Sequence, residues 1–141
     1  MKLYPGYETW SELDLLTGVL IGEASGEPNA GKIGVAITIK SRVDQPCWWG
    51  RNWREVILCD SQFSCWDDHN VARIVSARQE QGALWQLCRA IAIDAYMGRI
   101  EDHIGKPTHY HANPMPGNRP FPAWAKKLAR LTQIGGHIFY R

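Results

Sequence analysis

An apolar stretch near the start of the chain constrains the fold more than any other feature, and it ends at a carboxylate. The run Leu15-Leu16-Thr17-Gly18-Val19-Leu20-Ile21 leads through Gly22 to Glu23. A helix that is apolar on most of its surface has to be buried on most of it, so we expect a core helix over residues 10–23. A carboxyl group backed by apolar surface has a raised pKa, as a general acid working near neutral pH requires. The alternative is a solvated glutamate at a frayed helix end.

The residues that follow leave room around this acid and supply a second one. The neighbours of Glu23 are all small: Gly22, Ala24, Ser25 and Gly26. No bulky side chain therefore bars a large substrate. Glu27 comes four residues after Glu23, and Pro28 stops a simple continuation of the helix. The two acids would share a face if the helix continued, but Gly26 and Pro28 argue against that geometry.

Composition indicates an ordinary soluble globular protein. With 141 residues, 45% hydrophobic and 21% charged, we expect a single domain over residues 1–141. No apolar run reaches the roughly 20 residues of a membrane helix, so stable membrane insertion is not expected. The opening Met1-Lys2-Leu3-Tyr4-Pro5-Gly6 lacks the apolar core of a signal peptide. A net charge of +2 suits an anionic polymer such as the cell wall but is too small to indicate nucleic-acid binding.

The cysteines and tryptophans carry weaker signals. The four cysteines, Cys47, Cys59, Cys65 and Cys88, have no C-x-x-C spacing. Free buried thiols are the default expectation, and one disulfide within the first three is the alternative if the protein works outside the cytosol. Some of the seven tryptophans are expected in the core, and others are candidate sugar-stacking platforms, because the apolar face of a pyranose packs well on an indole. Trp48 and Trp49 cannot both face inward on a short loop, so one is either a candidate exposed aromatic or a loop anchor.

The spacing of the apolar residues and the positions of glycine and proline predict a mainly helical fold, in the mainly α (α+β) class, with a small extended or β portion. We expect helices over residues 10–23, 30–43, 53–59 and 80–97, and a further helix from Pro122 to the Gly135-Gly136 pair. Thr9 and Glu12 fit a capping box for the first helix, and Asn29 is expected to cap the second. Strands are expected around residues 108–111 and 137–140.

Several motifs together resemble a known family. Glu23-Ala24-Ser25-Gly26-Glu27-Pro28 resembles the E-A-x-G-E-P signature of SleB/CwlJ-type cell-wall hydrolases, the spore-cortex-lytic enzyme family. The resemblance continues in the family's order and near its spacing through Ser41-Arg42-Val43, Gln62-Phe63-Ser64, Thr108-His109-Tyr110-His111, Pro122-Ala123-Trp124 and Ile134 to Arg141. It covers residues 13–141. The resemblance implies a lysozyme-like fold and bacterial peptidoglycan as the substrate.

The reaction that the resemblance implies needs one carboxyl group. In a lytic transglycosylase, an acid protonates the glycosidic oxygen between N-acetylmuramic acid and N-acetylglucosamine, then accepts the proton of the muramic C6 hydroxyl as a 1,6-anhydro ring forms. We assign Glu23 this general acid/base role in a lytic transglycosylase or muramidase. Glu27 is a secondary catalytic candidate that tunes Glu23 or holds the turn. The family's glycan-cleaving members need no cofactor and no metal.

The remaining motifs of the resemblance imply which residues form the substrate-binding wall. These are Gln62, Phe63, Ser64, Tyr110, His111 and Trp124. Gln62 would bond an N-acetyl group of the substrate or merely a backbone carbonyl. Alternation along a strand would put Thr108 and Tyr110 on one face and His109 and His111 on the other. The two histidines fit three roles: a wall of the cleft, structural hydrogen bonding, or metal binding.

Two other functions remain open at this stage. The first is a zinc amidase that cuts between muramic acid and the stem peptide, using His109 and His111 with His69 or His137. The second is a non-catalytic wall-binding domain, which both acids and their small neighbours disfavour. We expect a monomer acting at the bacterial cell wall. No leader is visible in the sequence, which leaves two explanations. The protein is made in a host cytoplasm and released to the periplasm during phage lysis, or it is a bacterial protein whose leader is missing from this sequence.

Overall fold

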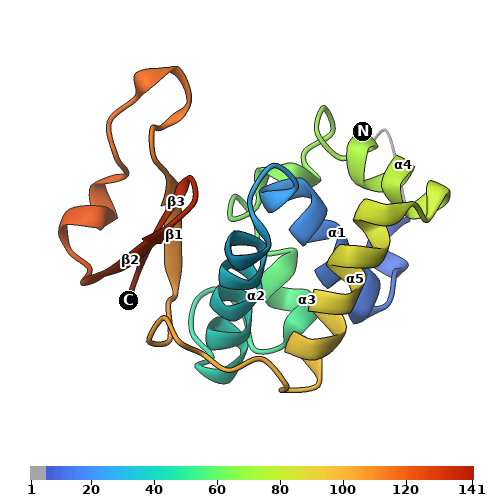
Figure 1. The fold of residues 1–141 in the computed structure, drawn as a ribbon, viewed down its shortest axis with the longest axis horizontal. Helices are drawn as coiled ribbons and strands as arrows, with labels where there is room; N and C mark the ends of the chain where they lie inside the picture. Colours follow the sequence, from blue (N-terminus) through green and yellow to red (C-terminus); the bar gives the residue numbers. More distant parts are fainter. Residues whose placement is uncertain (1–5) are drawn as a thin grey trace.

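The computed structural model describes residues 6–141 and shows a helical body with a small sheet at one side (Figure 1). The body consists of α1 (Glu12–Ala24), α2 (Asn29–Asp44), α3 (Trp53–Ile57), α4 (Ala72–Glu80) and α5 (Ala83–Tyr96). The sheet consists of β1 (His109–Ala112), β2 (Arg130–Ile134) and β3 (His137–Tyr140). Short 3₁₀ helices, η1 to η4, cover Tyr7–Thr9, Ser64–Trp66, Pro116–Asn118 and Ala123–Lys126. The expected mainly helical class with a small β portion is confirmed.

Part of the sequence-based expectation falls outside the described residues. The absence of a signal peptide was expected from the first six residues, and residues 1–5 of these are not described. Within residues 6–141, no helix has the length and apolar character needed to cross a membrane.

The first helix forms the centre of the core, as its apolar run predicts. Leu15, Leu16 and Ile21 are completely buried, together with Val19 and Leu20. α1 packs against α2, α4 and α5, which cover it on different sides. Because all sides are covered, the helix needs no polar face, and its end carries Glu23 into the interior of the molecule.

A glycine at the end of α1 allows the chain to approach closely. A Cβ atom on Gly22 would lie 2.3 Å from the Cβ of Cys65, which is too close for any real side chain. Gly22 therefore lets the segment that contains Cys65 lie directly against the last turn of α1. This contact brings the loop before η2 next to Glu23.

The predicted helix caps are wrong at both of the first two helices. Ser11, not Thr9, caps α1, because its side chain accepts a hydrogen bond from the backbone N–H of Asp14. Thr9 belongs to the separate turn η1, where its hydroxyl donates to the carbonyl of Gly6. Asn29 is the first residue of α2 rather than its cap, and the extended Pro28 precedes it.

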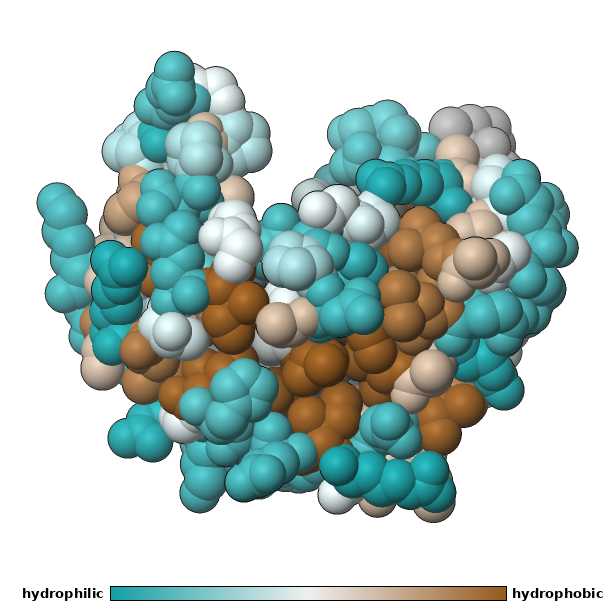
Figure 2. Space-filling model, viewed as in Figure 1, coloured by the Kyte–Doolittle hydropathy of each residue, from teal (hydrophilic) through white to brown (hydrophobic). Residues whose placement is uncertain are grey.

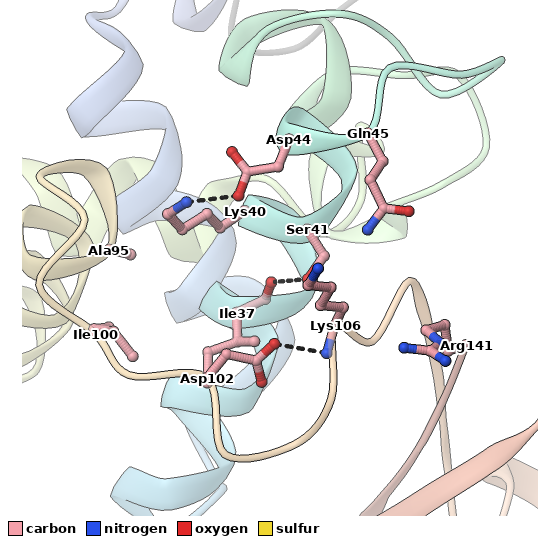
Figure 3. Close-up of a pocket in the computed structure, with 10 residues that line it drawn as sticks. All are labelled: Ile37, Lys40, Ser41, Asp44, Gln45, Ala95, Ile100, Asp102, Lys106 and Arg141. Carbon is pink, nitrogen blue, oxygen red and sulfur yellow. Dashed lines mark hydrogen bonds and ion pairs between the residues drawn. The ribbon is translucent and has the colours of Figure 1, made fainter.

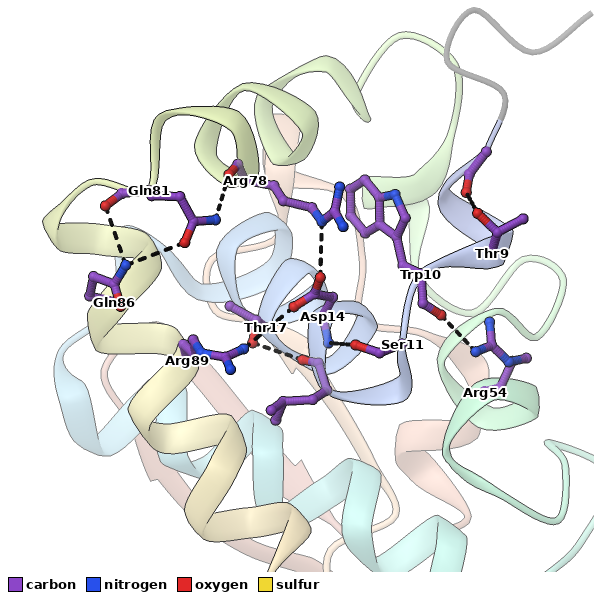
Figure 4. Close-up of polar contacts among 12 residues, drawn as sticks. Thr9, Trp10, Ser11, Asp14, Thr17, Arg54, Arg78, Gln81, Gln86 and Arg89 are labelled. Carbon is purple, nitrogen blue, oxygen red and sulfur yellow. Dashed lines mark hydrogen bonds and ion pairs between the residues drawn. The ribbon is translucent and has the colours of Figure 1, made fainter.

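Polar contacts tie the start of α1 to the helices around it (Figure 4). The carboxylate of Asp14 accepts from Arg78 Nε at 3.0 Å and from Arg89 Nη1 at 3.5 Å. The guanidinium of Arg78 also lies over the ring of Trp10, with Cζ 4.3 Å from the ring centroid. Arg54 donates to the carbonyl of Trp10 from the other side. These contacts fix the direction of α1, and with it the position of its far end.

The helix predicted over residues 80–97 forms as α5, over Ala83–Tyr96. α4 ends at Glu80, Gln81 adopts a left-handed conformation with φ of 53°, and α5 begins at Ala83. The apolar spacing of α5 was predicted, but α4 was not. Its residues are more polar, and only Ile74 among them is buried.

The predicted helix after Pro122 is also wrong. Only the 3₁₀ turn η4 forms there, and residues 130–134 form β2. The spacing of Trp124, Leu128 and Leu131 fits a helical period, but β3 offers a hydrogen-bonding edge to the same segment. Pairing with β3, from Arg130 opposite Tyr140 to Ile134 opposite His137, decides the local structure.

The sheet has the order β1-β3-β2, with both neighbours antiparallel to β3. Phe139 of β3 is completely buried and docks the sheet onto α2 beside Ile37. A Cβ on Gly34 would lie 2.6 Å from the Phe139 ring, so the glycine lets the ring contact the helix backbone. Figure 2 shows this face of the molecule hollowed between the part that carries the sheet and the helical body.

Candidate active site

Glu23 lies where the last turn of α1 meets the sheet. Its Oε1 accepts a hydrogen bond of 2.6 Å from the hydroxyl of Tyr110 on β1, and the thiol of Cys65 also bonds to its carboxylate. Burial raises the pKa of Glu23 above its ordinary value, and the bonds from Tyr110 and Cys65 oppose that rise. The same environment raises the pKa values of Tyr110 and Cys65, so both remain protonated donors. Glu23 can thus hold a proton, and when it loses that proton two hydrogen-bond donors stabilise the carboxylate.

A small pocket opens on this carboxyl group. It has a volume of about 220 Å³ and combines residues of α1, α2, the loop before η2, β1 and η4. Its lining residues are Glu23, Thr38, Arg42, Ser61, Gln62, Phe63, His109, Tyr110 and Trp124. Among the described residues, Glu23 is the only carboxylate in this lining.

Arg42 organises the side of the pocket formed by α2. Its Nε donates to the carbonyl of Thr108 at 2.7 Å, and its Nη1 donates to Oε1 of Gln62 at 3.0 Å. Its guanidinium carbon lies 5.0 Å from the centroid of the Trp49 ring. Burial lowers the pKa of Arg42. Sequence reasoning noted the Ser41-Arg42-Val43 block but gave Arg42 no role, although a buried arginine in a helix was a usable signal.

Three of the expected wall residues line the pocket together with Gln62. Phe63 is buried, Tyr110 bonds to Glu23, and Trp124 stands half-buried at the edge of the sheet. The ring of His109 lies 4.9 Å from the ring of Trp124 and also lines the pocket. Burial and the charge of Arg42 lower the pKa of His109 to about 4, so its imidazole is neutral at ordinary pH.

Ser64 and His111 lie outside the lining. Ser64 is exposed at the start of η2, where its carbonyl accepts from the side chain of Asn70. His111 is buried: its Nε2 bonds to the hydroxyl of Tyr140 and its Nδ1 to the carbonyl of Ala112, both at 2.8 Å. His111 therefore supports the sheet beneath the pocket wall.

Glu27 has a different environment from Glu23. Its Oε1 accepts from the backbone N–H of Gly136 at 2.8 Å and lies 3.7 Å from Nδ1 of His137. The buried Lys32 donates from Nζ to its backbone carbonyl. Glu27 thus connects the α1–α2 junction to the turn between β2 and β3, and it is not among the residues that line the pocket.

The cysteines and the other histidines are dispersed. All four cysteines are free; Cys65 and Cys88 are buried as expected, whereas Cys47 is exposed and Cys59 partly so. His69 is exposed and lines a different depression, and His137 lies beside Glu27. Among residues 6–141, no group of three or more His, Cys, Asp and Glu side chains is arranged to hold a metal ion.

A larger cavity, of about 500 Å³, lies along another face of α2 (Figure 3). Both of its carboxylates, Asp44 and Asp102, are already engaged in hydrogen bonds. Lys40 bonds to Asp44 at 2.6 Å, and Asp102 accepts from the backbone N–H groups of residues 104–106. It contains no buried titratable group comparable to Glu23, so the smaller pocket is the better candidate for chemistry.

The bond between Tyr110 and Glu23 leads to a pH prediction. The Tyr110 hydroxyl stabilises the carboxylate form, so Tyr110→Phe should raise the pKa of Glu23 further. A hydrogen bond to a charged group contributes about 1.5–3 kcal/mol, so its loss favours the protonated acid. If protonated Glu23 is the active form, the alkaline limb of the activity profile will move to higher pH. An unchanged limb in a pH–rate profile would show that Tyr110 does not tune the pKa of Glu23.

Known proteins resemble this chain in sequence profile and in fold. The profile of the cell wall hydrolase family matches residues 26–140. The catalytic domain of the germination-specific lytic transglycosylase SleB from Bacillus anthracis has a similar structure, with a TM-score of 0.67, 21% identity and 100% of each chain covered. The catalytic domain of the Bacillus cereus SleB protein gives a TM-score of 0.68 and 22% identity, covering 98% of this chain and 94% of that one. No curated protein matches the sequence.

Proposed function

Because this chain belongs to the cell wall hydrolase family, we propose that it cleaves the glycan of bacterial peptidoglycan as a lytic transglycosylase, with Glu23 as general acid and base. A structural relative, SleB from Bacillus anthracis, is described as a lytic transglycosylase. The cell wall is accordingly the place where we expect the protein to act.

The observation that carries this proposal is the isolation of Glu23. It is the only carboxylate in the lining of its pocket, and burial raises its pKa. Glycosidases that work with two carboxylates place both beside the scissile bond, roughly 5–10 Å apart. Glu27 is instead bound to the turn before β3. A reaction that needs one acid fits this pocket best.

The chemistry follows from the two protonation states of Glu23. Protonated Glu23 gives its proton to the glycosidic oxygen as the bond from that oxygen to C1 of N-acetylmuramic acid breaks. The resulting carboxylate, stabilised by Tyr110 and Cys65, then takes the proton of the muramic C6 hydroxyl. The C6 oxygen bonds to C1 and closes the 1,6-anhydro ring. Glu23 ends protonated, and no water is consumed.

Gln62 is the residue that we expect to orient the substrate. Its Oε1 is engaged by Arg42 at 3.0 Å, so its amide nitrogen is the group that would donate to an N-acetyl carbonyl in the pocket. Trp124 offers an aromatic surface at the pocket's edge. Phe63 supplies apolar lining beside Gln62.

The amidase alternative has less support from the geometry. Of the histidines that it would use, His111 has both ring nitrogens hydrogen-bonded within the protein. His69 and His137 lie in other environments, His69 in a separate depression and His137 beside Glu27. Nothing about these side chains favours the amidase reaction over the glycan-cleaving one.

Mass spectrometry of the soluble products released from purified peptidoglycan separates these reactions. A lytic transglycosylase releases muropeptides lighter by one water than the hydrolysed species, and a chelator has no effect. Free stem peptides with intact glycan, lost with chelator and restored with zinc, would show an amidase. Ordinary reducing-end muropeptides would show a hydrolase and would bring Glu27 back as a possible catalytic partner. Sedimentation with the wall and no released product would indicate a binding domain.

A further inference from the structure

An exposed tryptophan stands next to the candidate pocket, on a rigid turn. Trp48 and Trp49 are the central residues of a turn closed by hydrogen bonds between Cys47 and Gly50 in both directions. Trp49 turns inward, is 8% exposed and donates from Nε1 to the carbonyl of Arg42 at 2.9 Å. Trp48 turns outward and keeps 60% of its surface exposed. The expectation that one of the two is exposed is therefore confirmed.

The exposed ring is held by the same residue that organises the pocket. The Cζ atom of Arg42 lies 5.6 Å from the centroid of the Trp48 ring, and Arg42 itself lines the pocket together with Glu23. The ring of Trp49 packs edge-on against that of Trp48, with centroids 5.4 Å apart. A large apolar ring that packs against neighbours on one side and is left in water on the other can receive a ligand at a smaller cost in side-chain freedom than an unsupported ring.

From Trp48, aromatic rings continue in contact across the face of β1 that carries its histidines. Successive ring centroids are separated by 5.4, 6.2, 4.9, 5.6 and 4.2 Å. The row contains, in order, Trp48, Trp49, His109, Trp124, His111 and Phe121. Its inner members His109 and Trp124 line the pocket, and Phe121 at the far end is 46% exposed. Both ends of the row are therefore accessible, Trp49 and His111 within it are buried, and His109 and Trp124 share the pocket with Glu23.

We propose that Trp48 is a sugar-stacking platform that binds a saccharide of the glycan strand beyond the unit cleaved at Glu23. The inference rests on the proposed function for the identity of the polymer. An indole face matches the apolar face of a pyranose. Trp48 lies beside Arg42 but outside the pocket lining, so a glycan strand bound at Glu23 reaches it only if the strand extends past the pocket. Trp48 thus favours long glycan strands over short fragments and leaves the chemical step at Glu23 unchanged.

The binding test uses peptide-free glycan strands of alternating N-acetylglucosamine and N-acetylmuramic acid, with every variant also carrying Glu23→Gln to prevent turnover. Trp48→Ala should bind long strands about ten-fold more weakly, the size of one aromatic contact, and Trp48→Phe should recover most of the binding. The control is Met97→Ala, which removes a side chain of similar exposure, 59%, after the end of α5. Equal binding of the Trp48→Ala and Met97→Ala variants would overturn the proposal.

The kinetic test uses proteins that retain Glu23. Trp48→Ala should raise KM about ten-fold on long strands and leave kcat unchanged, with no effect on a single tetrasaccharide. An equal loss on long and short substrates would overturn the platform role. A melting temperature equal to that of the wild type shows that Trp48→Ala has not disturbed the fold. If the wild-type protein cleaves no glycan, the proposed function fails, whereas the turnover-independent binding assay still decides the role of Trp48. If lysis is normal and Trp48→Ala binds normally, only the platform fails.

Discussion

Glu23→Gln should abolish lysis of purified peptidoglycan and leave the protein folded. The amide has the shape of the carboxyl group and can still accept from the Tyr110 hydroxyl, but it can neither give nor take a proton. General acid–base catalysis contributes about 10²–10⁴-fold to a rate, so the loss should be at least of that size. The measurement is the initial rate of muropeptide release by the wild type and the variant.

Stability supplies the control for this variant. Burial raises the pKa of Glu23, so the folded protein holds a proton that the unfolded chain loses above its ordinary pKa. Folding stability therefore falls as pH rises from the ordinary glutamate pKa of about 4.5 toward the pKa in the folded state. Glu23→Gln removes this loss, and its melting temperature at neutral pH should equal or exceed that of the wild type. A melting temperature well below the wild type would mean that lost activity reflects unfolding rather than lost chemistry.

Glu27→Gln is the matched substitution for the second acid. The amide oxygen can still accept from the N–H of Gly136, so the connection to the sheet is kept. We expect substantial lytic activity to remain in the same muropeptide assay. A loss as complete as that of Glu23→Gln would give Glu27 a direct part in the reaction.

Phe139→Ala should be the most damaging of the substitutions in the sheet. Its ring is completely buried and fills the contact between β3 and α2, against the backbone of Gly34. Truncating a buried phenylalanine costs about 3–5 kcal/mol in the free energy of unfolding. Denaturant unfolding measures this loss directly. Because the sheet carries Tyr110, activity should also fall in the variant under conditions where the helical body remains folded.

Phe121→Ala is the matched control for that loss. It removes the same atoms from the same sheet region, but Phe121 is exposed. Its effect on the free energy of unfolding should lie within about 1 kcal/mol, because substitutions at the surface are usually small. If both variants lost the same stability, the docking of the sheet through Phe139 would not be the cause.

The helical core and the place of Glu23 in it could be predicted because their signals are local. Seven successive residues, of which Thr17 is the only polar one, force α1 into the centre of any fold this chain adopts. A carboxylate at the end of such a helix is buried with it. The E-A-x-G-E-P resemblance then identified this acid as the one to examine.

The partners of Glu23 could not be derived from local pattern. Tyr110 lies 87 residues away along the chain, and only the docking of the sheet brings its hydroxyl to the carboxylate. Arg42 joins Gln62 and Thr108 by bonds that span 20 and 66 residues. A helical period shows that Arg42 is on α2, but it cannot show that two distant loops supply its acceptors.

The error at residues 122–134 has the same origin. Trp124, Leu128 and Leu131 repeat at helical spacing, and nothing in that segment reveals that β3 will offer it a strand edge. The predicted strand at 137–140 was correct and contains the reason for the error, since β2 exists only as the partner of β3. Strand pairing of this kind overrides the helical pattern of a short segment.

The position of β3 in the sheet sets the order in which the site can assemble as the protein is synthesised. Within the described residues, β1 and β2 each pair with β3 and not with each other. A nascent chain that has emerged as far as β2 already contains the complete sequence of α1 with Glu23, but it lacks the strand on which β1 forms. Tyr110 can reach Glu23 only after residues 137–140 have left the ribosome. A chain that ends before residue 137 therefore lacks the strand that holds β1, and with it the support for Tyr110 beside Glu23.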